Sequence, residues 1–311
     1  MIRTILTTAA ISLLLLTNYY QTQSQPLTEF EIWQQKHQKM YIGEERIYRE
    51  AVYQTNKQKI ESHNKQQERT YDMGENQFMT LTQDEFISLY LTQVDAPELE
   101  FEEEREQVFD GAEPLKFVDW SSYSTIKSQG QCGSGWAFSV SNSIEAWYGI
   151  RGGRNISAST QQLIDCDTYS KGCYSGTNYN AMHYAQQIGL MNSMSYPYVA
   201  QQQGCRYNRG EFRINTYNFV GNQQQTLQNY LQYYPVSVGV DALNWQFYSN
   251  GTFADCGQNI NHYVLAVGFD FGYNWLIQNS WGYGWGENGS IRLSPGNTCD
   301  CLNSPQNLNF L

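Results

Sequence analysis

Residues 129–138 read QGQCGSGWAF, and the helix predicted from this stretch organises the second half of the chain. Apolar residues recur there at helical spacing, at Trp136, Val140, Ile144, Trp147 and Tyr148. Ser134 precedes them and belongs to the residue types that favour a helix N-cap. We therefore predict a helix from Ser134 to about Ile150, with Gly135 in its first turn.

Three further segments follow near the C-terminus. Residues 261–268 read NHYVLAVG, in which a histidine opens an apolar strand. Residues 278–282 read QNSWG, and residues 284–289, GWGENG, complete a W-G-x-x-G run. Taken alone, the histidine fits a structural role and Asn279 fits a turn. Their order and spacing relative to the helix start indicate one common site.

In this order, the segments resemble those of papain-like cysteine peptidases. The nucleophile segment of that family reads Q-G-x-C-G-S-C-W-A-F, and Gly135 stands where its second cysteine attacks the substrate carbonyl. The resemblance implies His262 as the base and Asn279 as the residue that orients it, with Trp281 shielding their hydrogen bond. It also implies that Gln129 and the backbone N–H of residue 135 form the oxyanion hole.

The cysteines indicate disulfides. All seven lie after residue 131, and such a density in a secreted chain favours disulfides over free thiols. The resemblance implies three pairs: Cys132 with Cys173, Cys166 with Cys205, and Cys256 with either Cys299 or Cys301. Spacing alone does not choose between the last two. A zinc site is the competing interpretation, but no C-x-x-C occurs and histidines are few. We therefore expect no metal and no cofactor.

The resemblance also implies the architecture of residues 112–311. We expect an α+β protein with the papain-like two-lobe fold, in which a helical lobe meets an antiparallel, β-barrel-like lobe. Apolar or alternating runs fit strands of the second lobe at 236–240, 263–268, 275–277 and 291–293. The substrate-binding residues carried over by motif are Ser175, Gly176, Gly239, Asn261 and Trp281. Ser175 replaces a glycine of the family's G-C-x-G-G substrate wall.

Residues 26–97 form a separate module with its own signature. Six residues follow the pattern E-x3-R-x3-F-x2-N-x3-I-x3-N, with tyrosine for phenylalanine: Glu45, Arg49, Tyr53, Asn56, Ile60 and Asn64. Their spacing places them on one face of a helix. The pattern resembles the inhibitory prosegment of the cathepsin L branch. Residues 74–78 match the start of its G-x-N-x-F-x-D element, whose final aspartate is Thr80 here.

Composition fits a secreted protein of enzyme size. The chain has 311 residues, 41% of them hydrophobic, which is enough for a large core. Arg3 precedes an apolar run that ends at Leu16, so we predict a signal peptide over residues 1–23. We expect no membrane span after its removal, a monomer, and passage through the secretory pathway to the outside or to a lysosome-like compartment.

Acidic residues are concentrated before the cysteine-rich half. Residues 1–111 carry 19 acidic and 10 basic residues, whereas residues 112–311 carry 11 and 9. We predict that residues 98–111 form an acidic linker where the prosegment is cut away. The chain has no basic patch, so we expect no nucleic acid partner. The expected ligands are substrate-like peptides or proteins, and the chain's own prosegment in cis.

Gly135 leaves the function open among several interpretations. The chain is an inactive homologue that keeps a peptide-binding cleft, an active cysteine endopeptidase if residue 135 is natively cysteine, or a secreted binding or structural protein that uses the fold alone. A substitute nucleophile is disfavoured, because Ser134 points about 100° away from its neighbour on a helix and Cys132 is assigned to a disulfide. Departures at Thr80 and Ser175 favour the inactive homologue.

Overall fold

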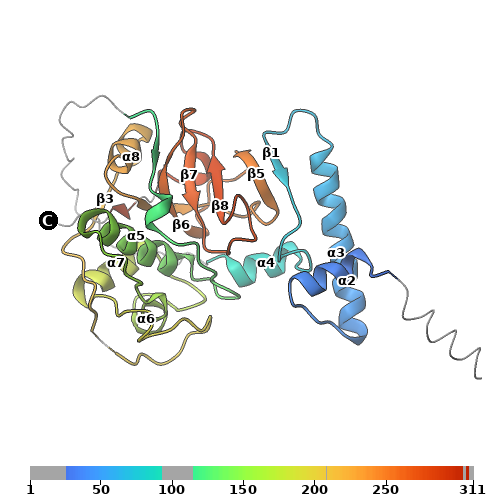
Figure 1. Ribbon diagram of the computed structural model, residues 1–311, viewed down its shortest axis with the longest axis horizontal. Helices are drawn as coiled ribbons and strands as arrows, with labels where there is room; N and C mark the ends of the chain where they lie inside the picture. Colours follow the sequence, from blue (N-terminus) through green and yellow to red (C-terminus); the bar gives the residue numbers. More distant parts are fainter. Residues whose placement is uncertain (1–25, 93–114, 208, 304–305, 308–311) are drawn as a thin grey trace, which may run out of the picture. The chain divides into compact units, whose positions relative to one another are not determined.

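The computed structural model describes residues 26–92, 115–207, 209–303 and 306–307 (Figure 1). The predicted signal peptide and the predicted acidic linker lie outside these ranges. The chain divides into two compact units, of which the first ends at Gln54 and the second begins at Thr55. Within the described ranges, no helix is long and apolar enough to cross a membrane.

The first unit consists of two helices joined by aromatic packing. Helix α2 spans Glu29–Lys36, and helix α3 spans Gly43–Asn64 and continues into the second unit. The rings of Phe30 and Trp33 lie 5.5 and 5.9 Å from the ring of Tyr53, and all three side chains are buried. The long helix predicted from the spaced pattern is confirmed, because α3 contains all six of its residues.

The rest of the prosegment folds together with the second unit. Strand β1 (Tyr71–Met73) pairs antiparallel with β5 (Tyr248–Phe253), and helix α4 covers Gln83–Tyr90. The buried Asn56 amide donates hydrogen bonds of 2.9 Å to two backbone carbonyls between β1 and α4. These bonds satisfy groups that would otherwise be buried without a partner, and so fix the segment that follows α3.

The helical lobe is built around the predicted central helix. Its helices are α5 (Gly135–Gly152), α6 (Thr160–Cys166) and α7 (Asn178–Gln187). Trp136, Val140 and Ile144 of α5 are fully buried in one hydrophobic cluster with residues of α6 and α7. Helix α5 ends in a left-handed C-cap at Gly153 (φ 58°), a conformation that glycine adopts without strain.

The second lobe is a nine-stranded open sheet with the order β1-β5-β8-β7-β6-β4-β9-β3, in which β2 pairs with β6. The strands not yet given are β2 (Val118–Asp119), β3 (Asn218–Phe219), β4 (Val236–Val240), β6 (His262–Phe269), β7 (Trp275–Gln278), β8 (Ser290–Leu293) and β9 (Gln306–Asn307). Short helices η1 (Ser121–Tyr123), α8 (Gln224–Leu231) and η2 (Thr298–Asp300) lie between strands in the sequence. The pairing is antiparallel as expected, apart from the parallel pair β5–β8.

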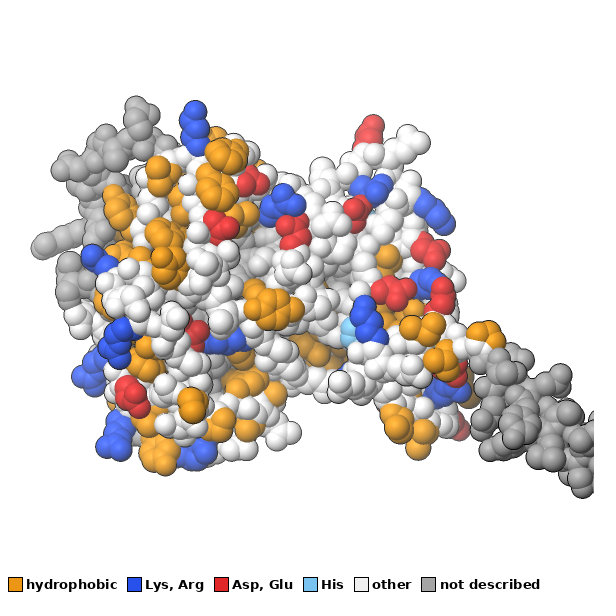
Figure 2. Space-filling view, in the orientation of Figure 1, with side chains coloured by type: hydrophobic (Ala, Val, Ile, Leu, Met, Phe, Trp, Pro, Cys, Tyr) orange, Lys and Arg blue, Asp and Glu red, His pale blue; other side chains and the backbone are white. Residues whose placement is uncertain are grey.

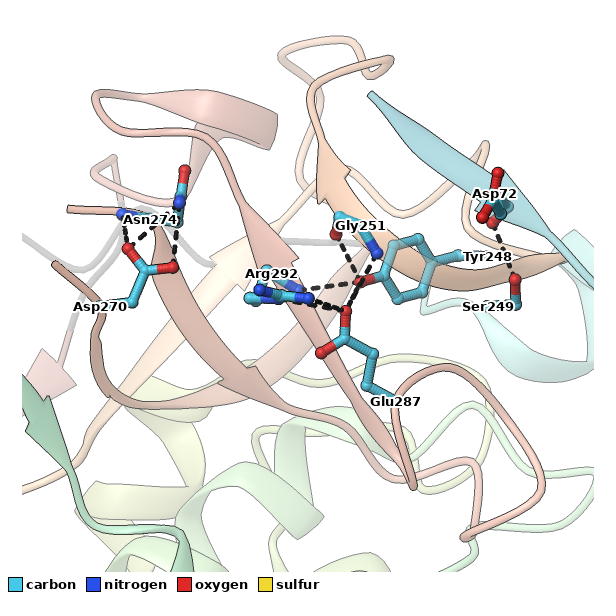
Figure 3. A network of polar contacts seen from close by, with 8 residues as sticks. All are labelled: Asp72, Tyr248, Ser249, Gly251, Asp270, Asn274, Glu287 and Arg292. Atoms are coloured by element: carbon cyan, nitrogen blue, oxygen red, sulfur yellow. Dashed lines mark hydrogen bonds and ion pairs between the residues drawn. The ribbon is translucent and has the colours of Figure 1, made fainter. Parts of the chain in front are cut away.

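A polar network holds the edge of this sheet (Figure 3). One carboxylate oxygen of Glu287 accepts hydrogen bonds from the Tyr248 hydroxyl at 2.9 Å and from the Arg292 guanidinium at 2.8 Å. The Ser249 hydroxyl donates to the carbonyl of Asp72 at 3.0 Å. The network thus ties β5 to β8 on one side and to the prosegment strand β1 on the other.

On the face drawn in Figure 2, Lys and Arg side chains are dispersed among polar and hydrophobic ones. The acidic side chains are scattered in the same way. This face therefore presents no single charged surface for docking.

Candidate active site

Gly135 is the first residue of α5 and is buried. Ser134 holds the N-cap position as predicted, but its hydroxyl does not cap the helix. It donates instead to the Cys132 carbonyl at 3.2 Å and lies 3.1 Å from the Tyr198 hydroxyl. The start of α5 is therefore held from outside the helix, by the loop that carries Cys132 and by Tyr198.

A side chain at residue 135 would meet the imidazole of His262. A Cβ built on Gly135 lies 2.5 Å from His262 Nδ1 and 2.9 Å from the Tyr263 carbonyl oxygen. His262 is the first residue of β6 and is 0% exposed. The ring thus occupies the space in front of the first turn of α5, and any larger residue at 135 requires the ring to move.

The hydrogen bond to Asn279 determines which nitrogen of the His262 ring carries the proton. His262 Nε2 lies 2.9 Å from Asn279 Oδ1, an atom that only accepts, so we assign the ring proton to Nε2. Nδ1 then carries the lone pair, and it has no hydrogen-bond partner among the described residues. Burial lowers the pKa of His262 to about 4, and the Asn279 hydrogen bond opposes this effect. A neutral imidazole therefore directs an unpaired acceptor at residue 135.

Asn279 and Trp281 surround this ring, as the resemblance implied. The Trp281 indole stacks on the imidazole with 5.0 Å between ring centroids and 25° between planes. Asn279 Oδ1 also accepts a hydrogen bond of 2.7 Å from the Ser280 backbone N–H. The three consecutive residues after β7 thus fix the orientation of His262.

Gln129 lies beside the same site and is fully buried. Its Oε1 accepts a short hydrogen bond of 2.6 Å from the Ser280 hydroxyl, which fixes the orientation of the amide. Its Nε2 donates to the Cys132 carbonyl at 2.8 Å and to the Tyr90 carbonyl at 2.9 Å. Ser280 is missing from the residues singled out by motif, although it stands between Asn279 and Trp281 in the QNSWG segment.

The end of the described prosegment covers this site. The backbone N–H of Thr92 donates to the Asn261 carbonyl at 2.7 Å, and its hydroxyl donates to the Gly133 carbonyl at 3.0 Å. The Leu91 carbonyl oxygen would lie only 2.7 Å from a Cβ at residue 133, so the two backbones are in close contact there. The prosegment therefore accepts a hydrogen bond from Gln129 Nε2 and covers the start of α5.

Uncharged groups make many of the other contacts between the prosegment and the sheet lobe. Phe78 and Phe86 meet the Trp281 indole edge-on, with centroids 5.6 and 5.2 Å away. Side-chain amides donate to backbone carbonyls from Asn76 to Gln246 (2.7 Å), from Gln77 to Trp281 (2.7 Å) and from Gln83 to Leu243 (2.5 Å). Amides do not change charge in mild acid, so protonation does not directly remove these hydrogen bonds.

The predicted substrate wall is closely packed. A Cβ added to Gly176 would lie 2.7 Å from Nε1 of Trp136, so only glycine fits against this indole. Ser175 is buried, and its carbonyl accepts a hydrogen bond of 2.7 Å from the Lys171 N–H. The serine that replaces the family's glycine is thus accommodated without opening the loop.

Gly239 and Asn261 lie near the start of the His262 strand, because Gly239 of β4 pairs with Tyr263 and Asn261 directly precedes His262. Gly239 is in the middle of β4, where an added Cβ would lie 2.9 Å from the Ile260 side chain. The Asn261 side chain donates to Asp241 at 3.0 Å and accepts from the Ala242 N–H at 2.8 Å. Asn261 therefore offers its backbone carbonyl to the prosegment, whereas its side chain stabilises the loop after β4.

Three disulfides form in the expected pairs. They join Cys132 to Cys173, Cys166 to Cys205 and Cys256 to Cys299. The alternative left open for Cys256 is thereby decided, and Cys301 is a buried free thiol. Burial raises the pKa of the Cys301 thiol to about 12, so it is not a reactive thiolate.

Known proteins are similar to this chain over both the prosegment and the two-lobe domain. The model of the papain family cysteine proteases matches residues 115–307, and that of the cathepsin propeptide inhibitor domain matches residues 30–86. A cathepsin L-like protein of Paramecium tetraurelia is 51% identical, over 96% of this chain and 97% of its own length. Papain of Carica papaya is 37% identical over 86% of this chain and 81% of its own length.

Solved proforms show the same architecture. The structure of digestive procathepsin L2 proteinase from Tenebrio molitor larval midgut has a TM-score of 0.83 and 28% identity, and the match covers 90% of this chain and 98% of that one. Fold, motif order and sequence similarity agree across the prosegment and the two-lobe domain. The chain therefore belongs to the papain family of cysteine proteases, in the cathepsin L-like group that carries an inhibitory propeptide.

Proposed function

We propose that this chain is a proteolytically inactive member of the family, in which Gly135 stands at the position of the nucleophile and the peptide-binding cleft is retained. His262, Asn279 and Gln129 would then be the remainder of a catalytic site, namely its base, the residue that orients the base, and an oxyanion donor. Ser175, Gly176, Gly239, Asn261 and Trp281 would line the substrate path.

The observation that carries this proposal is the unpaired Nδ1 of His262. It is buried, it has no partner among the described residues, and it lies 2.5 Å from where residue 135 would bear a Cβ. A buried acceptor left without a hydrogen bond costs roughly 1–3 kcal/mol, so such a group usually has a partner. A thiol at residue 135 is the partner that this arrangement lacks.

Two alternatives remain distinct from this proposal. If residue 135 is natively cysteine, the intact Gln129, His262 and Asn279 would support an active cysteine endopeptidase. If the cleft has lost its affinity for peptides, the chain would be a secreted binding or structural protein that uses the fold alone.

The domain organisation belongs to the same proposal. We infer a signal peptide over residues 1–23, a prosegment over 26–97, an acidic linker over 98–111 and a peptidase-like domain over 112–311. A monomer that passes through the secretory pathway to the outside or to a lysosome-like compartment fits this order. The prosegment is the first ligand of the cleft, because it already occupies Gln129 Nε2.

Hydrolysis is the direct test. After the prosegment has been removed by an added peptidase, the protein is expected to show no thiol-dependent turnover of a fluorogenic dipeptide amide. Loss of the nucleophile from a catalytic triad lowers kcat by about 10⁶-fold. The remaining groups would give a residual acceleration of roughly 10³–10⁴ over water. Turnover that is abolished by a thiol-alkylating epoxide would contradict the proposal and support the active endopeptidase.

Peptide binding separates the inactive enzyme from a protein that uses the fold alone. The prosegment-free protein is expected to bind its isolated prosegment, or a non-covalent peptide, in isothermal calorimetry. A peptide aldehyde is unsuitable, because its affinity depends on the missing thiol. If neither ligand gives a heat of binding at about 1 mM, the binding free energy is smaller than about 4 kcal/mol. The chain would then be a protein that uses the fold alone.

A further inference from the structure

The helical lobe contains a cavity that is formed by none of the proposed catalytic or substrate-binding residues. It lies between the end of α6 with the loop that follows and the second half of α7, and the Cys166–Cys205 disulfide lines it. Its volume is about 390 Å³, within the range of sites that hold small molecules. It is here named the Asp167 cavity.

Aromatic and apolar groups form much of its wall. Tyr184 and Cys166 contribute buried surface, whereas Cys205 is exposed and Tyr169 is 60% exposed. The Tyr169 ring meets the imidazole of His183 edge-on, with 5.7 Å between centroids. The faces of aromatic rings attract cations, and quaternary ammonium groups are bound by aromatic side chains in this way.

Asp167 places a buried carboxylate in this aromatic setting. The residue is 4% exposed, and burial raises the pKa of its carboxyl group, against the effect of neighbouring hydrogen bonds and of His183. One oxygen accepts from the Ser170 hydroxyl at 2.6 Å and the other from the Tyr169 N–H at 3.0 Å. The Ser170 backbone N–H also donates to this carboxylate. A carboxylate has about four acceptor positions, so capacity for one further donor or a cation remains.

Asp167 is the only acidic side chain among the nine described residues that line the cavity, and His183 is the only basic one. None of the nine described residues that line the cavity is lysine or arginine. A buried carboxylate is costly without a compensating charge, and an organic cation would supply one. The combination of one carboxylate with aromatic walls selects for a ligand that carries positive charge and apolar surface together.

We propose that the Asp167 cavity binds a small organic ammonium ion. The cationic group lies against the Asp167 carboxylate, and its methyl or methylene groups pack on Tyr169, Tyr184 and the disulfide. This inference does not depend on the state of residue 135 and concerns a site separate from the proposed cleft.

Choline and its neutral isostere 3,3-dimethylbutan-1-ol provide the test, because they have nearly the same shape and differ in charge. Both are titrated into the full-length protein at about pH 7.5. Ligand-observed proton NMR is expected to detect choline binding at millimolar concentration. The neutral isostere is expected to bind at least about tenfold more weakly, since it makes no ionic contact.

Two variants and one control locate the site. Asp167→Asn keeps the acceptor for Ser170 but removes the charge, and is expected to weaken choline binding by at least about tenfold. Tyr169→Ala removes one aromatic wall and is expected to weaken it several-fold. Tyr174→Ala is the matched control, since Tyr174 is a 63% exposed tyrosine outside the lining, and should change nothing.

Three results would overturn the proposal. They are the absence of choline binding at about 20 mM, equal binding of choline and its neutral isostere, and full binding by both cavity variants. If Asp167→Asn proves unfolded by circular dichroism, Tyr169→Ala and the comparison of the two ligands still decide the outcome.

Discussion

Replacement of Gly135 by cysteine is expected to create thiol-dependent peptidase activity in the prosegment-free protein. His262 and Gln129 keep their hydrogen bonds to Asn279 and Ser280, so under the proposed function the variant supplies the missing nucleophile to the proposed base, its orienting residue and the oxyanion donor. The gain over the unmutated protein is expected to reach about 10⁶-fold in kcat, the size of the loss when a nucleophile is removed from such a triad. Hydrolysis of a fluorogenic dipeptide amide, and labelling by a thiol-alkylating epoxide, measure it.

The new side chain must also displace a neighbour. Because a Cβ at residue 135 lies 2.5 Å from His262 Nδ1, the imidazole has to withdraw before the thiol fits. Gly135→Ala separates this steric effect from the chemistry. It is expected to show no turnover and to lose about 1–3 kcal/mol of stability in urea unfolding, as overpacked cores do. Gly135→Ser adds a hydroxyl that does not ionise near neutral pH, and is expected to stay inactive with the same substrate.

One result would contradict the proposed remainder of a catalytic site. If Gly135→Cys is folded, has its prosegment removed and carries a free thiol by titration, yet hydrolyses nothing, the other groups no longer work together. Activity in Gly135→Ala equal to that of the cysteine variant would show instead that some other residue is the nucleophile.

The sequence was sufficient for those parts of the site that are contained in short segments. Helix α5 follows from the helical spacing of Trp136, Val140 and Ile144. The burial of the helix on all sides over residues 135–146 does not follow from that spacing. His262 opens strand β6, and the Asn279–Trp281 segment directly follows the adjacent strand β7, so their meeting follows once the motifs are assigned to one sheet. The prosegment helix α3 was likewise predicted from a local pattern of spaced residues.

Contacts made through backbone atoms could not be predicted in this way. The Tyr90 carbonyl reaches Gln129 Nε2, and the Thr92 N–H reaches the Asn261 carbonyl, across long stretches of chain. Any residue type supplies these groups, so the sequence contains no trace of the pairing. The choice of Cys299 over Cys301 depends on a left-handed turn of non-glycine residues, with Cys299 at φ 55°, which no composition rule anticipates.

Acid is expected to destabilise the unmutated protein through His262 in particular. The ordinary histidine pKa of 6.5 applies to the unfolded chain, whereas burial holds the folded value at about 4. Between these two values the unfolded state binds a proton that the folded state does not, so stability falls as the pH falls. Above pH 6.5 His262 does not lower the free energy of unfolding. By pH 4 its protonation in the unfolded chain has lowered that free energy by about 3 kcal/mol.

Urea unfolding at several pH values between 7 and 4 measures this loss, with His262→Gln as the variant that cannot titrate. Carboxylates titrate in both proteins, so the difference between their two pH profiles isolates the imidazole. The chain has four histidines, and the variant identifies the ring resonances of His262 for a direct NMR titration. Parallel pH profiles, together with a His262 pKa near 6.5, would show that the ring is not buried as the structure has it.

In Gly135→Cys the same loss of stability should shrink, because a thiolate beside the ring stabilises the imidazolium and raises its pKa. A His262 pKa that is unchanged in that variant would mean that the thiol and the imidazole do not interact, and the activity expected of the cysteine variant would then have no base to support it.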